Sequence, residues 1–160
     1  TGVPFQIHYE IEDDLLAPLE AMLARYPQAK VIWCHVAQIR YSVRSTRYGA
    51  AYLRGLFARH PNLYVDTAFG GPRSTYKPSG ERHARVWDGA DIRREWKELI
   101  ADHPYRFLAA LDIGGDRTAR LEEWVRGLRD FLERVPDKVR PIVAYGAGWK
   151  LLFGEDIVAG

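Results

Sequence analysis

Four side chains that can bind a metal or exchange a proton each follow a short apolar run: His8, His35, Asp66 and Asp112. The runs are FQI, VIWC, LYV and RFLAAL. Imidazole and carboxylate groups are ligands for divalent metals, and a carboxylate can also orient a ligating imidazole. If the runs are parallel strands, their carboxyl ends meet at one edge of a sheet, where such folds build their active sites.

Each residue taken alone has a simpler explanation. A single histidine after an apolar run is more often a hydrogen-bonded core or edge residue, and this explanation is favoured for His8 in isolation. Asp66 alone is equally consistent with an aspartate that bonds the backbone of a turn. The matching positions of His8, His35 and Asp112 within repeated units favour a shared site instead.

A degenerate repeat supplies those units. In MLARYPQAKVIWCH, LFARHPNLYVDTA and LIADHPYRFLAALD, a helical segment ends before a proline and a nearly continuous apolar run follows. The residue before a proline is pushed out of the helical region, and continuous apolar runs are typical of buried parallel strands. With FQIH added in front, the pattern predicts βαβ units with strands over 5–8, 31–35, 63–66 and 106–112.

Apolar residues at helical spacing predict the helices that position these strands. They fall at 15–26, 51–57, 92–100 and 121–132, and the tail VRPIVAYGAGWKLLFG predicts a broken helical segment. The long connections 36–49 and 68–91 have no periodicity of their own, which is typical of functional or flexible loops.

Composition limits the class of protein. With 160 residues, 47% hydrophobic and 28% charged, we expect a single folded domain over 1–160. Lys plus Arg (23) nearly balances Asp plus Glu (21), so nothing favours a nucleic-acid partner. No apolar run approaches the roughly 20 residues that cross a bilayer. Cys34 is the only cysteine, which excludes an intrachain disulfide; a cytoplasmic location is favoured, with an exported form left open.

Three arginines in the loop after His35 are candidates for binding a substrate carboxylate. They are Arg40, Arg44 and Arg47. A guanidinium fork matches the geometry of a carboxylate. A solvated basic loop explains them equally well.

Five motifs in order resemble the C-terminal half of the amidohydrolase superfamily: QIHYE, VIWCHV, NLYVDTA, RFLAALDIG and IVAYGAGWKLLFG. The branch they resemble is the amidohydrolase-related one, which includes carboxymuconate-semialdehyde-type decarboxylases. The resemblance implies a TIM-type (β/α)₈ barrel with a divalent metal, commonly zinc, at the carboxyl ends of the strands. It implies that His8 and His35 stand where the fifth- and sixth-strand histidines bind metal or its water. Asp112 would be the eighth-strand metal ligand and proton acceptor.

The chain departs from the family pattern in two places. The His-x-His pair of the first strand is absent, and the tail reads Tyr145-Gly146-Ala147-Gly148 where the family usually has Tyr-Gly-Asn-Ala. A complete barrel needs roughly 250 residues. We therefore expect an α/β fold corresponding to strands five to eight of a barrel, with strands one to four encoded upstream of Thr1.

The predicted function is metal-dependent hydrolysis of a C–N or C–O bond in a small molecule. If the arginines bind the substrate, that molecule would carry a carboxylate. Asp112 and His35 are the predicted catalytic residues, and His8, His35 and Asp112 the predicted ligands of zinc or another divalent metal. One alternative is a metal-dependent, non-oxidative decarboxylase on the same site. Another is a non-catalytic half-barrel that associates with a partner or with a second copy of itself, since its sheet edges would be exposed.

Overall fold

The sheet is parallel, and its strands lie side by side in chain order. The computed structural model describes residues 2–9, 12–37, 47–68 and 86–157. The strands are β1 (Phe5–Ile7), β2 (Val31–Trp33), β3 (Leu63–Asp66) and β6 (Phe107–Leu108). The connecting helices are α1 (Asp13–Arg25), α2 (Ala50–Arg59) and α3 (Arg94–Asp102). The predicted α/β class and repeated βαβ order are therefore confirmed.

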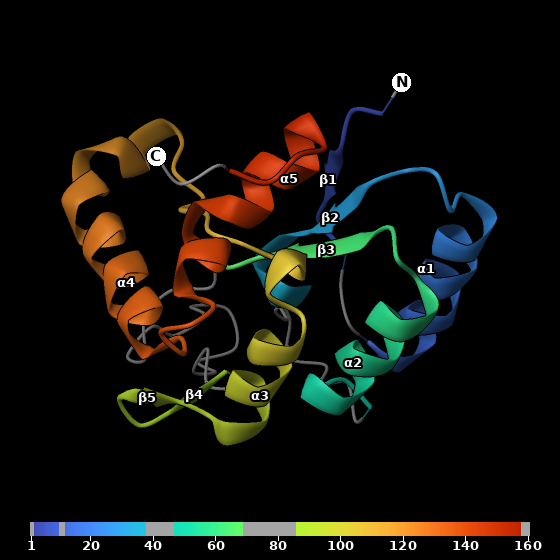
Figure 1. Cartoon of the computed structure of the whole chain (residues 1–160), viewed down its shortest axis with the longest axis horizontal. Coiled ribbons are helices and arrows are strands. Elements are labelled where there is room, and N and C mark those ends of the chain that lie inside the picture. The colour runs from blue at the N-terminus through green and yellow to red at the C-terminus, as the bar shows by residue number, and fades with distance from the viewer. Residues whose placement is uncertain (1, 10–11, 38–46, 69–85, 158–160) are drawn as a thin grey trace.

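Helices cover both faces of this sheet (Figure 1). Alternate strand residues point to opposite faces, so Trp33, Val65 and Phe107 belong to the large core that includes buried residues of α1, α2 and α3. The intervening residues Ile32 and Leu108 pack instead against the C-terminal segment. That segment consists of a π-helical turn (Ile142–Gly146) and α5 (Ala147–Phe153). The chain thus forms three layers, helix on sheet on helix.

A fourth long helix, α4 (Leu121–Arg134), faces the residues that follow β3 and β6. Phe131 is its one fully buried apolar residue, and it packs on Trp87 of a small hairpin with the rings nearly perpendicular. The hairpin pairs β4 (Trp87–Asp88) with β5 (Asp91–Ile92) and was not predicted within the connection 68–91. In the described part of the chain, no helix is long and apolar enough to cross a membrane.

Three of the four predicted strands are too long, and only 63–66 is confirmed over its full length. The first ends at Ile7 and the second at Trp33, so His8 and His35 lie just beyond their strands. The last covers Phe107–Leu108 alone, because the next two amides leave the ladder. Ala109 N–H donates to the carbonyl of Val143 (3.2 Å) and Ala110 N–H to the Thr67 hydroxyl (3.3 Å).

The prediction that 5–8 is a buried strand is also wrong. The side chain of Phe5 is 43% exposed and Gln6 is exposed. Among the described residues, β1 pairs with β2 alone and forms one end of the sheet. An edge strand covered on one side cannot bury its side chains as a central strand does.

Asn62 joins the end of α1 to the start of β2. Its Nδ2 amide donates to the carbonyl oxygens of Tyr26 (3.0 Å), Ala29 (3.1 Å) and Leu23 (3.4 Å). Its own backbone carbonyl accepts from the Val31 amide (2.9 Å). Asn62 and Leu23 are buried, whereas Ala29 is half-buried and the Tyr26 carbonyl also accepts from the Ala29 amide (3.0 Å). The Leu23 and Ala29 carbonyls therefore depend most on the Asn62 amide.

We expect Asn62→Ala to lower the free energy of unfolding by about 2 kcal/mol, because it removes the three hydrogen bonds by which one buried side chain joins α1 to β2. Urea unfolding followed by circular dichroism measures this. Glu98→Ala is the control, since it removes an exposed i,i+4 pair with Arg94 and should cost roughly 0.5 kcal/mol or less. Equal losses for the two variants would contradict the role given to Asn62.

Candidate functional site

His35 lies in a tight turn immediately after β2. The turn spans Cys34–Ala37, and two of its residues adopt left-handed backbone angles: His35 (φ 61°) and Val36 (φ 50°). A β-branched residue such as Val36 rarely adopts this conformation, which costs on the order of 1–3 kcal/mol. Such strain persists only where surrounding contacts hold it, and it is concentrated at functional sites.

Two contacts hold the turn. The carboxylate of Asp66, at the end of β3, accepts hydrogen bonds from the amides of His35 (2.7 Å) and Ala68 (3.1 Å) through the same oxygen, Oδ1. The Tyr48 hydroxyl donates to the carbonyl of Val36. All of these residues except Ala68 are buried. Asp66 therefore acts through backbone amides, and it fixes where the His35 side chain begins.

The His35 ring is oriented by a third contact. Its Nδ1 lies 2.7 Å from the carbonyl oxygen of Ala68. A carbonyl can only accept, so Nδ1 must carry the hydrogen. When the ring is neutral, its lone pair is then on Nε2, which lies 4.0 Å from Oδ2 of Asp112. The site thus presents a basic nitrogen and a carboxylate oxygen to the same small space.

Asp112 and His8 complete the group. Asp112 also has a left-handed backbone (φ 52°), and its side chain is 36% exposed, against 9% for His35. The His8 ring is 4.7 Å from the His35 ring between centroids, with the planes tilted by 59°. His8 is exposed, and the chain just after it is held by a bond from the Trp33 indole to the Tyr9 carbonyl (2.7 Å). Of the three predicted metal ligands, His8 and Asp112 therefore each lie next to His35.

The side chains of these three residues are of the types that bind a divalent metal. Tetrahedral zinc with ligands near 2.0 Å separates them by roughly 3.4 Å, so His35 and Asp112 need to approach by about half an ångström. The bond from His35 Nδ1 to a carbonyl is the outer contact that ligating histidines make. As they stand, no three His, Cys, Asp or Glu side chains among residues 2–9, 12–37, 47–68 and 86–157 are grouped closely enough to hold a metal.

The predicted carboxylate-binding arginines are not shown at this site. Arg40 and Arg44 lie outside the described residues. Arg47 contacts Asp13 at the start of α1, where its guanidinium donates to the backbone carbonyl (2.6 Å) and lies 3.8 Å from the carboxylate. Binding of a substrate carboxylate by these arginines stays a prediction.

Sequence reasoning missed the contacts that hold His35. The bond of Asp66 to the His35 amide depends on the register between β2 and β3 and was not predicted. Its bond to the Ala68 amide, two residues further on, is the turn contact that the sequence left open for Asp66. Nothing in the sequence indicates that the Ala68 carbonyl accepts from His35, or that the Tyr48 hydroxyl donates to the Val36 carbonyl. The signals that pointed to the site were the positions of His8, His35, Asp66 and Asp112 at or after the ends of apolar runs.

We expect neutral His35 to carry its hydrogen on Nδ1, because its partner there is a carbonyl. Long-range ¹H–¹⁵N correlation spectra of the folded protein distinguish the two tautomers, and His35→Gln assigns the signal. A neutral ring with its hydrogen on Nε2 would contradict the contact with Ala68.

We expect Asp66→Ala to lower the free energy of unfolding by about 3 kcal/mol, because two buried or half-buried amides lose a charged acceptor. Asp66→Asn keeps an oxygen at the same position and should lose less than half as much. Thermal and urea unfolding of the pair measure the difference. Equal losses would show that the carboxamide oxygen cannot replace the carboxylate as acceptor of the two amides.

Comparison of the chain with protein-family models, with curated proteins and with solved structures finds no match. The resemblance to the amidohydrolase superfamily therefore stays a prediction from the motifs, and the chemistry of this site rests on its own residues.

Proposed function

We propose that the carboxyl edge of the sheet is the site of a metal-dependent hydrolase, in which His8, His35 and Asp112 hold a divalent cation, with zinc favoured. The observation that carries this proposal is the placement of His35. Its Nδ1 is tied to the Ala68 carbonyl and its Nε2 faces Asp112 Oδ2 at 4.0 Å. Two imidazoles and one carboxylate are a donor set that catalytic zinc sites use, with a further position left for water or substrate.

The proposed fold is the second half of a (β/α)₈ barrel. Its support is a parallel sheet with strands in chain order and with α1, α2 and α3 on one face. One feature departs from a barrel: Ala147 and Leu151 of α5 pack on the other face, where a barrel has its interior.

A bound zinc ion would supply a water molecule of lowered pKa and would polarise a substrate carbonyl. The residues of the chain divide the remaining work. His35 has one ring nitrogen left after Nδ1 bonds Ala68, so a His35 that binds the cation cannot also accept a proton. Asp112 has two carboxylate oxygens and is the more exposed of the two side chains.

Asp112 is therefore the proposed proton acceptor. It accepts a proton from the attacking water as the water oxygen bonds to the substrate carbonyl carbon. It returns that proton to the leaving nitrogen or oxygen as the C–N or C–O bond breaks. His35 and His8 keep their protonation states throughout, and Asp66 acts as a positioning residue through the His35 amide.

We expect the purified chain to bind one equivalent of Zn²⁺ or Co²⁺. His8→Ala and Asp112→Ala each remove a proposed ligand, so they should weaken binding by more than the roughly 10- to 100-fold that loss of a contact to a ligand costs. Titration calorimetry and the visible spectrum of Co²⁺ measure this. Hydrolysis of small amides and esters, assayed with metal, should fall by at least about 100-fold in Asp112→Ala.

Asp88→Ala is the matched control, because it removes an exposed carboxylate from the β4–β5 hairpin. It should change neither metal affinity nor hydrolysis. The proposal fails if the chain binds no metal, or if His8→Ala and Asp112→Ala behave as Asp88→Ala does.

A further inference from the structure

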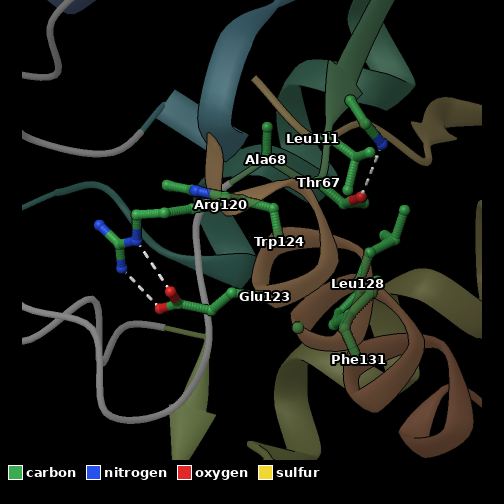
Figure 2. A pocket seen from close by; sticks show the side chains of 10 residues that line it. Thr67, Ala68, Leu111, Arg120, Glu123, Trp124, Leu128 and Phe131 are labelled. Atoms are coloured by element: carbon green, nitrogen blue, oxygen red, sulfur yellow. Dashed lines mark hydrogen bonds and ion pairs between the residues drawn. The ribbon is translucent and has the colours of Figure 1, made fainter. Parts of the chain in front are cut away.

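A cavity of about 110 Å³ lies between α4 and the residues that follow β3 and β6 (Figure 2). Thr67, Ala68, Ala110 and Leu111 line it on the sheet side. On the α4 side, the apolar lining comes from Trp124, Leu128 and Phe131. The cavity is next to the proposed catalytic group of His8, His35 and Asp112, but none of these three residues lines it.

Two direct links join the cavity to that group. Ala68, which lines the cavity, provides the carbonyl that binds His35 Nδ1 at 2.7 Å. Leu111, which also lines it, is the residue before Asp112. The Cα atoms of Leu111 and Asp112 are about 3.8 Å apart, so the cavity wall continues directly into the residue that carries the proposed catalytic carboxylate.

Gly127 is the unexpected residue in the wall. It lies in the middle of α4, where glycine is less favourable than alanine by about 1 kcal/mol. Its φ is not in the left-handed region, and a Cβ built on it would meet no described atom within 4 Å. Neither close packing nor backbone conformation in the described structure explains a glycine here. Its effect is to widen the cavity.

Charge at the cavity is balanced. Arg120 and Glu123 both line it and form a two-pronged ion pair, with N–O distances of 2.8 and 2.6 Å. The hydrogen bond from Arg120 lowers the pKa of Glu123, so the carboxylate is ionised at neutral pH and offsets the guanidinium. Both side chains are more than 60% exposed, at 61% and 64%, so they border the opening to solvent. Away from this pair, the lining side chains are uncharged, so the cavity offers no net charge to an ion.

We propose that this cavity binds the apolar body of a small uncharged ligand, a branched or cyclic aliphatic group of about four or five carbon atoms. The size follows from the volume, since a cavity of about 150 Å³ accommodates benzene. The ligand's amide or ester group then lies toward Asp112 and His35. This last step rests on the proposed function, whereas occupation of the cavity does not.

Isovaleramide and isovalerate are the matched probes, because they share one branched chain and differ in the charge of the end group. The protein has five tryptophans, so its indole N–H groups give up to five signals in a ¹H–¹⁵N spectrum. Trp124→Phe identifies the signal from the cavity. We expect isovaleramide to shift that signal saturably with a millimolar dissociation constant, and to leave Trp149 of α5 unmoved.

Gly127→Leu is the blocking variant, because it fills the cavity and replaces a poor helix former with a good one. It should fold and should bind isovaleramide at least about tenfold more weakly. Gly148→Leu is its control, since Gly148 lies in α5 and a Cβ added there would likewise meet no described atom within 4 Å. It should bind the probe as the parent does.

The cavity proposal is overturned if the Trp124 signal does not move, or if Gly127→Leu binds isovaleramide as tightly as Gly148→Leu. If isovalerate binds as tightly as isovaleramide, the proposal that the cavity selects uncharged ligands is wrong. Retention of isovaleramide binding after chelator treatment supports the cavity independently of metal. If binding is retained but the metal-loaded protein hydrolyses no amide or ester, the cavity proposal stands and the proposed function falls.

Discussion

The bond from the His35 amide to the Asp66 carboxylate is the contact on which the carboxyl edge depends. It joins the turn after β2 to the last residue of β3, and the same oxygen accepts the Ala68 amide. The Ala68 carbonyl in turn accepts from the His35 ring. One buried oxygen thus fixes both the backbone from which the imidazole starts and the acceptor that orients it. The Tyr48 hydroxyl also holds the left-handed turn, through the Val36 carbonyl.

The parallel sheet explains why this contact lies next to other reactive groups. Strands that follow one another in the chain place their carboxyl ends side by side, so His8, His35 and Asp112 meet although they are far apart in sequence. Side chains within the strands are committed to the two packed faces. Residues just past the strand ends have no such commitment, which leaves them available for chemistry and leaves room for a cavity beneath α4.

The sequence predicted the sheet better than the segments that leave it. The run LYVD is apolar up to its final aspartate and was predicted to its full length, and the order of helices and strands followed from the prolines. The early end of β6 could not be predicted, because it depends on acceptors at Val143 and Thr67 supplied by other elements. The β4–β5 hairpin did have a signal, Gly89 at the first position of the two-residue loop, where tight hairpin turns need the positive φ (58°) that it adopts.

The residues of the candidate site could be predicted from the sequence, but the contacts that hold them in place could not. His8, His35 and Asp112 were predicted from their positions after apolar runs, whereas the left-handed angles of His35, Val36 and Asp112 appear only in the structure. Trp124 and Leu128 were predicted on the apolar face of a helix; Leu128 does pack on the main core, and both also line the cavity, which the sequence did not predict.

Residues that break local rules gather in this one region. Three non-glycine residues there have positive φ, and a helix contains a glycine that no described contact requires. A sequence selected only for stability would replace such residues, because each costs free energy in the folded state. Their concentration around His35, Asp112 and the cavity beside α4 is what the proposed binding and catalysis would lead us to expect. The layers of helices on the sheet supply the stability that offsets this cost.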